Sequence, residues 1–336
     1  MKMNRWTKWT ALLLGLLVLS LITAVFSLTV GEMPIRLGDL PTIMRGDSIE
    51  YRVLRYIRLP RMILALSVGG SLSLAGCLLQ GVFRNPLVEP YTMGLSGGAS
   101  LGVAICIVFG VSSLQYIWLP LSGFIGSLAV MGVIYALSLR RRSVEVQRML
   151  LIGVMISFVT SSAVLFIEAI AHPEDLQKII LWSMGSLTQS DNGMVIGMAV
   201  LSLLLLLISC LFATPMNAMR LGLRGAGHLG LDTRRTVRWL FVISSLATGC
   251  SIAVAGVIGF VGLVIPHVVR ITIGNDYRVV IPASFLLGGL FLLLCDLVAR
   301  TIIAPNELPI GVITGIVGGL LFIVLLTRPR SRKPLL

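Results

Sequence analysis

Ten apolar segments follow one another along the chain, and polar stretches separate most of them. A helix needs about 20 apolar residues to cross a bilayer, and inside lipid it must pair its own backbone groups. With 56% hydrophobic and 12% charged residues, the chain has little material for a soluble domain. We therefore expect one all-α integral membrane domain over residues 1–336, with about ten transmembrane helices in a compact bundle. The expected helices are 9–30, 61–82, 92–110, 115–138, 149–171, 193–213, 237–256, 258–272, 280–299 and 309–327.

The beginning of the chain resembles a secretory signal peptide, because Lys2, Arg5 and Lys8 precede an apolar run. That run extends from Ala11 to Val30. It is longer than the hydrophobic region of a signal peptide, and no A-x-A cleavage site follows it. We therefore expect the first segment to remain as an uncleaved transmembrane helix.

Basic residues are shared unequally between the two sides that ten spans would create. An even number of spans places both termini on one side, and the side richer in Lys and Arg is normally cytoplasmic. With cytoplasmic termini, 19 of the 27 basic residues lie inside and 8 lie outside. The net charge of +13 is therefore interpreted as a sign of orientation and not of nucleic-acid binding. Six outward arginines at 36–61 run against the rule.

The segment 256–270, GVIGFVGLVIPHVVR, is apolar but contains residues that an ordinary span avoids. Gly259 and Gly262 weaken a helix, and Pro266 removes a backbone donor. In lipid, a broken backbone is tolerated only where protein or a water-filled cavity covers it. We expect a short, interrupted helix near 258–272 at the centre of the bundle, where such elements line transport pathways.

Glycines recur at helical spacing in two places. Gly94, Gly98 and Gly102 form one series, and Gly311, Gly315 and Gly319 form the other. Small residues four positions apart allow helix backbones to approach closely, so both series indicate tight helix packing.

A basic loop at 214–236, TPMNAMRLGLRGAGHLGLDTRRT, is long enough for two short helices. It is either an ordinary connector or a docking surface for a soluble partner.

Several chemistries have no residues to support them. The chain has no P-loop motif, no catalytic triad motif and no Cys or His spacing typical of a metal site. Three acidic residues lie near the spans, each close to an outer end: Glu168, Asp296 and Glu307. We expect Asp296 to pair with Arg300, four residues later on the same helix. An intramembrane acid would mark an ion-coupled carrier. The energy source is therefore expected outside this chain.

A series of longer motifs resembles the permease subunit of the FecCD family, ABC importers for iron–siderophores, haem and cobalamin. The resemblance covers nearly the whole chain. Its motifs are RLPR at 58–61, GGSLSLAGCLLQGVFRNPLVEPYTMGLSGGA at 69–99, WSMGSL at 182–187, GFVGLVIPHVVR at 259–270, GNDYR at 274–278, DLVAR at 296–300 and ELPIGVITGIVGG at 307–319.

The resemblance implies a subunit in the bacterial cytoplasmic membrane that pairs with a second permease, either another copy or a paralogue. It also implies two cytoplasmic ATPase subunits that hold ATP and Mg²⁺, an extracytoplasmic substrate-binding protein, and no cofactor in this chain. A ferric siderophore is the favoured cargo, with cobalamin or haem as alternatives. A stand-alone secondary transporter and a membrane-embedded enzyme are the competing hypotheses.

Residue roles follow from the same resemblance. Arg58, Arg61 and Arg300 match outward arginines that receive acidic residues of the binding protein, although Arg58 and Arg61 could instead snorkel toward the interface. The loop at 216–232 matches the coupling helices that enter a cleft of the ATPase. The family's residues there are Leu221, Gly222, Ala226, Leu229 and Gly230, whereas Leu223 and Arg224 replace residues that are usually acidic.

The pathway is expected between the two permeases, lined by parts of 92–102 and 258–270. Leu320 stands where many family members carry proline after the glycines. Asn85, Pro86 and Pro90 are expected to shape a turn near the cytoplasmic face. His267 is interpreted as a structural residue and not as a metal ligand.

Overall fold

The computed structural model describes residues 5–31, 33, 35, 38, 48–110, 115–138, 146–188 and 191–327, and its regular structure is helical throughout these ranges. Eight helices are long and apolar enough to cross a membrane. They are α1 (Arg5–Thr29), α4 (Leu59–Phe83), α6 (Gln115–Ser138), α7 (Val146–Ile170), α9 (Asn192–Leu211), α12 (Thr233–Ala255), α14 (Tyr277–Thr301) and α15 (Ile310–Thr327). Two shorter apolar helices are α5 (Leu95–Val108) and α13 (Val261–Ile273).

Each of the ten predicted segments therefore contains a helix, and the predicted all-α membrane fold is confirmed. Two boundaries differ. The second span begins earlier, because α3 (Ile49–Val53) and a π-helical turn (Leu54–Arg58) run directly into α4. The third span is shorter than expected, because a 3₁₀ turn (Tyr91–Met93) precedes α5 and 14 residues extend only about 21 Å as a helix.

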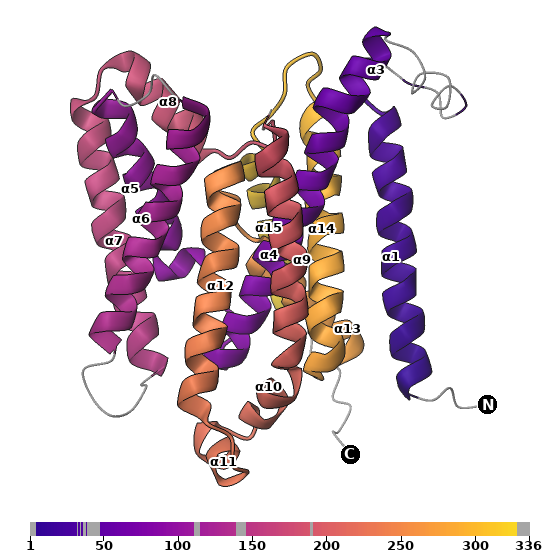
Figure 1. Ribbon diagram of the computed structural model, residues 1–336, viewed down its shortest axis with the longest axis vertical. Helices are drawn as coiled ribbons and strands as arrows, with labels where there is room; N and C mark the ends of the chain where they lie inside the picture. Colours follow the sequence, from indigo (N-terminus) through magenta and orange to yellow (C-terminus); the bar gives the residue numbers. More distant parts are fainter. Residues whose placement is uncertain are drawn as a thin grey trace.

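The two ends of the bundle differ in what they carry. α8 (Pro173–Ser183) and α3 lie at one end, the α8 end, whereas α10 (Ala213–Met219) and α11 (Leu223–His228) project from the other, the α10–α11 end (Figure 1). The first turn of α1 and the last turn of α15 lie at the α10–α11 end, as an even number of crossings requires. Residues 1–4, Arg36, Arg45, 139–145 and 328–336, which carry part of the counted charge, lie outside the described residues.

α8 is a helix that the sequence reasoning did not predict. Pro173 occupies its first turn together with Glu174 and Asp175. Proline at the start of a helix and acids beside its positive end both favour helix formation at this point. The segment is too short and too polar for a hydropathy search to find.

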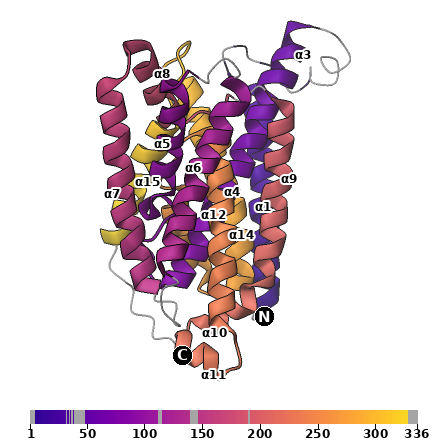
Figure 2. The ribbon, with the colours of Figure 1, turned by 60° about the vertical axis from the view of Figure 1, so that its left-hand side comes forward.

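α4 forms the centre of the bundle. It packs against α14, α12, α13 and α9 (Figure 2). Most of its side chains are buried. α1, α6, α7, α9 and α15 instead expose broad apolar faces, as helices at a lipid boundary do. The fold is thus an inner group of largely buried helices, α4, α12, α13 and α14, surrounded by helices with an apolar exterior.

Glycines bring the inner helices unusually close together. A Cβ added at Gly69 would lie 2.4 Å from the carbonyl oxygen of Gly288 in α14. A Cβ added at Gly76 would lie 1.9 Å from the carbonyl oxygen of Gly262 in α13. Because no side chain can occupy such a contact, α4 holds its neighbours backbone to backbone.

The first glycine series is only partly what its spacing suggests. Added Cβ atoms at Gly98 and Gly102 would lie 2.6 Å and 2.3 Å from carbonyl oxygens of Gly126 and Ser122 in α6. Gly94, however, is not part of α5: it adopts a left-handed conformation with φ +79° just before the helix and faces α7. The preceding 3₁₀ turn takes Gly94 out of the helical register.

The second glycine series lies mostly on an open face. Gly311 approaches the carbonyl oxygen of Met184, since its added Cβ would lie 2.4 Å away, but nothing in the described chain lies within 4 Å of one added at Gly315. The close contact further along belongs to Gly318, against Phe260 at 2.5 Å, rather than to Gly319 at 3.8 Å. This face of α15 remains available to another molecule or to lipid.

Replacing Gly76 with alanine should destabilise the protein by about 2 kcal/mol or more, because the new methyl group must push α13 away from α4. Thermal unfolding of the purified protein in detergent measures the change. Gly132→Ala is the matched control, since an added Cβ in that part of α6 meets nothing within 4 Å. Equal effects of the two substitutions would contradict the backbone contact as the cause.

Candidate functional site

The helix interruption predicted near 258–272 is present, but it precedes α13 and does not lie at Pro266. Residues 256–260 are not helical, and α13 then runs without a break from Val261 to Ile273. Gly256 at φ +69° and Phe260 at φ +69° turn the chain on either side of this segment. Phe260 packs against Gly318 of α15.

Backbone groups of the interruption find partners in other segments. The amide of Ser186 donates to the carbonyl oxygen of Ala255 at 2.8 Å. The amide of Ile258 donates to the hydroxyl oxygen of Tyr91 at 3.1 Å. Non-helical backbone inside a bilayer needs such partners. The WSMGSL motif is therefore part of this site, and the amide of Gly311 also bonds to the carbonyl of Met184 at 3.0 Å.

Pro266 leaves a carbonyl of α13 without its usual donor, and α4 supplies a replacement. Because proline has no N–H, the carbonyl oxygen of Gly262 lacks the donor four residues ahead. The Nε2 group of Gln80 donates to this oxygen at 3.1 Å and to the carbonyl oxygen of Leu263 at 3.2 Å. The close approach of Gly76 to Gly262 brings the α4 side chain within reach.

Glu89 is a carboxyl that the sequence reasoning missed. It lies in the turn between α4 and α5, where Asn85 accepts the amide of Leu87 at 3.0 Å as the predicted turn requires. Its Oε2 atom is shielded from solvent and has no hydrogen-bond partner among the described residues. Burial raises the pKa of Glu89 to about 7, although the backbone N–H of Phe260 acts in the opposite direction. Glu89 lies between α4 and α5 and is not one of the three acids that were expected near the outer ends of the spans.

At the α8 end, Arg61 is the centre of an ion-pair cluster in which Arg61 and Asp296 are buried and Glu307 is exposed. Its Nε atom lies 2.6 Å from Oδ1 of Asp296, and its Nη1 atom donates to both carboxylate oxygens of Glu307 at 2.8 Å and 2.7 Å. The predicted pairing of Asp296 with Arg300 exists only at 3.5 Å. The short contact of Asp296 is with a different helix, since α4 carries Arg61.

Arg58 and Arg300 are also bound within the chain. Arg300 donates to the carbonyl and the hydroxyl oxygens of Ser27 at 2.8 Å and 2.9 Å. Arg58 donates to the carbonyl oxygen of Leu28 at 2.6 Å and to that of Met33. With Arg61 they are only 4–7% exposed, so the three guanidinium groups join α1, α4, α14 and the loop before α15.

The exposed charges at this end belong to other residues. Arg52 and Arg55, on the helical extension before α4, are exposed. Glu307 and Arg61 line a cavity of about 280 Å³ between residues 185–188 and 308–310. Of the six arginines at 36–61, Arg36 and Arg45 lie outside the described residues, and the sequence did not reveal which of the other four are buried.

The loop at 216–232 forms the two short helices α10 and α11, as predicted. Leu221 and Leu229 are 69% and 66% exposed, whereas Ala226 is fully buried. Gly222 and Gly230 have φ values of +96° and +83°, which a residue with a side chain rarely adopts. The loop therefore presents two exposed leucines at the α10–α11 end.

Asn217 connects this loop to the bundle. Its Nδ2 group donates to Oδ1 of Asp276 at 2.8 Å, and its Oδ1 atom accepts the amide of Tyr277 at 3.1 Å. Asp276 caps α14 and follows directly on the end of α13. Two hydrogen bonds therefore join α10 to the α13–α14 turn.

The described residues contain no group of three or more His, Cys, Asp or Glu side chains that could hold a metal ion. His267 packs its ring edge-on against Phe322, with ring centroids 5.9 Å apart.

The FecCD transport family matches residues 16–328 of this chain. The hemin transport system permease protein HmuU of Yersinia pestis is 37% identical over 96% of the chain and 97% of the relative. The vitamin B12 import system permease protein BtuC of Shigella boydii is 37% identical over 95% of each. A solved structure, described as an inward-facing conformation of an ABC transporter assigned to the metal-chelate type, has a TM-score of 0.86 and 31% identity, and it covers 94% of this chain and 99% of the other.

The raised pKa of Glu89 predicts a pH-dependent stability. Between about pH 4.5, the ordinary value, and about pH 7, the folded protein keeps a proton that the unfolded chain releases. Stability therefore falls as pH rises through this window and is level above it. Glu89→Gln should unfold at the same temperature as wild type below pH 4.5 and be roughly 3 kcal/mol more stable at pH 8.

Thermal unfolding in detergent over this pH range measures the difference. Glu174→Gln, at an exposed position in α8, should show no such divergence. A constant difference between Glu89→Gln and wild type across the range would rule out a titration of Glu89.

Proposed function

The chain belongs to the FecCD transport family, and on that premise we propose a metal chelate as the cargo of this ABC-importer permease, with a ferric siderophore as the first candidate. Hemin and vitamin B12 are the alternatives, because named relatives at 37% identity carry them. All three cargoes are bulky complexes that arrive with their metal already coordinated. Such a cargo needs a wide path and no metal ligands from the permease.

The observation that carries the proposal is the extent of the match. It covers residues 16–328, and so includes the interrupted helix, the ion-pair cluster and the projecting loop together. ATP hydrolysis takes place on a separate chain, and the α10–α11 loop is where we place that ATPase. Its exposed Leu221 and Leu229 would enter a complementary surface, and its basic character supports a cytoplasmic location for this end and for both termini.

The α8 end is where we place the extracytoplasmic binding protein. Arg52 and Arg55 give this end exposed positive charge, which steers an acidic partner and fixes its register. Arg58, Arg61 and Arg300 contribute by holding the surface rigid through their internal bonds. The second permease, a copy or a paralogue, would cover the open glycine face of α15.

Movement follows from the connections already described. ATP-driven closure of the ATPases shifts α10, and Asn217 transmits the shift to the turn between α13 and α14. α13 is short and begins at a non-helical segment, so it can tilt without unwinding a long helix. That tilt would open the path between the two permeases inward.

Uptake of radiolabelled cargo by a strain lacking this gene tests the proposal. The panel contains ferric hydroxamates, ferric catecholates, ferric citrate, hemin and vitamin B12. We expect uptake of one chelate to be lost in the deletion strain and to return when the gene is restored. If only the uptake of hemin or of vitamin B12 is lost, that compound replaces the siderophore as the proposed cargo. Uptake of the whole panel at the wild-type rate would contradict the metal-chelate proposal.

Asn217→Ala should uncouple ATP hydrolysis from transport, because it removes both bonds between α10 and the α13–α14 turn. In proteoliposomes containing the assembled importer, we expect ATP hydrolysis within about twofold of wild type and transport per ATP reduced about tenfold. Thr214→Ala, at an exposed position on the same helix, serves as the control. Loss of hydrolysis and transport in equal proportion would contradict transmission through Asn217.

A further inference from the structure

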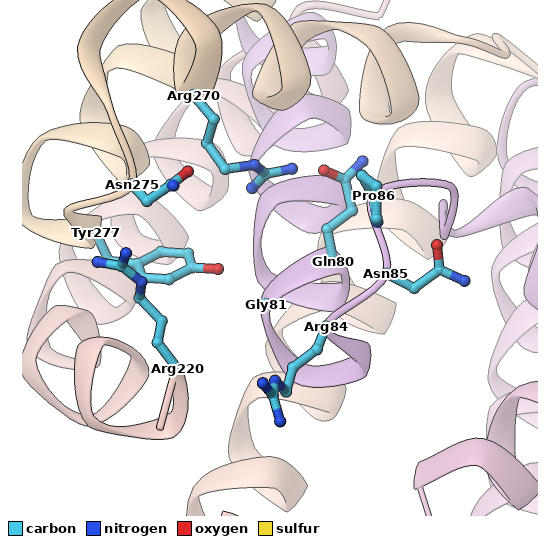
Figure 3. A pocket seen from close by; sticks show the side chains of 9 residues that line it. All are labelled: Gln80, Gly81, Arg84, Asn85, Pro86, Arg220, Arg270, Asn275 and Tyr277. Carbon is cyan, nitrogen blue, oxygen red and sulfur yellow. The ribbon is translucent and has the colours of Figure 1, made fainter. Parts of the chain in front are cut away.

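A polar cavity of about 250 Å³ opens at the α10–α11 end, apart from both the ion-pair cluster and the projecting leucines. It lies between the end of α4, the end of α10 and the segment joining α13 to α14 (Figure 3). Its polar lining includes Arg84, Arg220 and Arg270, together with Gln80, Asn275 and Tyr277. None of the lining residues is acidic.

Arg270 is the residue that requires an explanation. Its Nη1 and Nη2 groups are both shielded from solvent, and neither meets a hydrogen-bond acceptor with good geometry among the described residues, although the side chain of Tyr277 in the same lining interacts with Arg270. An arginine side chain stays protonated in proteins. Leaving a buried charged donor unsatisfied is costly, more so than for a neutral group. Arg270 therefore sits where an acceptor carrying negative charge would be strongly stabilised.

The other two arginines stand at the mouth of the cavity. Arg84 and Arg220 are exposed, and a Cβ added at Gly222 would lie 3.4 Å from Nη1 of Arg84. The nearby Asp276 does not line the cavity, and its Oδ1 atom accepts from Asn217 and from the amide of Arg278. The C-terminal ends of α4 and α13 lie here, and the partial negative charge of a helix C-terminus favours nearby cations. This reduces the repulsion among the three arginines but does not neutralise Arg270.

Gln80 adds a second unsatisfied atom. Its Nε2 group donates to carbonyl oxygens of α13, but its Oε1 atom is shielded from solvent and accepts no hydrogen bond from the part of the chain that the structure describes. In Figure 3 Arg270 and Gln80 reach into the cavity from α13 and α4. A ligand suited to this site would carry oxygens that accept hydrogen bonds from guanidinium groups and one hydroxyl that donates to the amide oxygen of Gln80. A phosphate group supplies the accepting oxygens, and its own P–OH or a neighbouring alcohol supplies the hydroxyl.

We propose that this cavity binds a phosphate group, either as free phosphate or as the headgroup of an anionic phospholipid. Guanidinium groups bind phosphate oxygens through paired, charge-assisted hydrogen bonds. Basic pockets between transmembrane helices at the cytoplasmic side are also suited to lipid headgroups. The site touches α4, α10 and α13, so an occupant would bridge the loop and the interrupted helix. The proposal does not depend on the identity of the cargo.

Two probes distinguish the sources. Inorganic phosphate is titrated against the purified full chain in detergent, and thermal unfolding reports binding. Native mass spectrometry of the chain taken from nanodiscs containing phosphatidylglycerol reports retained lipid. A rise in unfolding temperature with phosphate indicates the free anion, and retained phosphatidylglycerol indicates the headgroup; either result supports the site if it depends on Arg270.

Variants decide that dependence. Arg270→Gln should weaken the apparent affinity for the effective probe about tenfold or more, and Arg84→Gln, at the exposed mouth, should weaken it less without disturbing the interior. Arg278→Gln removes an exposed arginine that does not line the cavity and should leave binding unchanged. If Arg270→Gln does not fold, Arg84→Gln against Arg278→Gln decides the result. Absence of binding by both probes, or equal effects of the cavity and control variants, would overturn the proposal.

Discussion

Backbone hydrogen bonding in the absence of water governs the centre of this structure. A polar group left unpaired in hydrocarbon costs several kcal/mol, so the non-helical segment 256–260 can exist only with partners from elsewhere. Those partners come from the turn before α5, through Tyr91, and from the segment after α8, through Ser186. Sequence motifs that look unrelated, RNPLVEPYTMG and WSMGSL, are therefore parts of one arrangement.

Close helix packing makes the same arrangement possible. Gln80 reaches the carbonyls of α13 because the backbones of Gly76 and Gly262 touch. A larger residue at either glycine would move the amide away and leave the carbonyl exposed by Pro266 without a donor. Glycine, proline and glutamine at these positions therefore act together, and the effect of changing one depends on the others.

Hydropathy was sufficient to predict the ten helical segments, because length and apolarity decide whether a helix can cross a bilayer. It was insufficient where contacts with neighbouring segments determine the local conformation. Gly94 matched a helical spacing, yet the 3₁₀ turn before it shifts it out of α5. Pro266 was expected to interrupt a helix, but Gln80 compensates for it and the break lies earlier.

Three-dimensional placement also changed the interpretation of charges. Arg58, Arg61 and Arg300 have the sequence signature of outward residues, and nothing in the sequence reveals that Asp296, Glu307 and Ser27 enclose them. Glu89 escaped notice because it lies in a turn rather than in an apolar run. A detectable signal was present: a single acid between Pro86 and Pro90 in an otherwise apolar motif.

The two ends of the molecule differ in mechanical character, and this difference bears on transport. At the α8 end, several charged hydrogen bonds tie α1, α4, α14 and the following loop into one unit. At the other end, α10 is connected to the α13–α14 turn through Asn217, and α13 meets α4 through backbone contact and the Gln80 amide. Under the proposed mechanism, a force applied to α10 would act on α13, a short helix that begins at a non-helical segment, while the ion pairs hold the opposite surface together. In such an arrangement α13 is the part that would move, and the buried arginines would define the frame against which it moves.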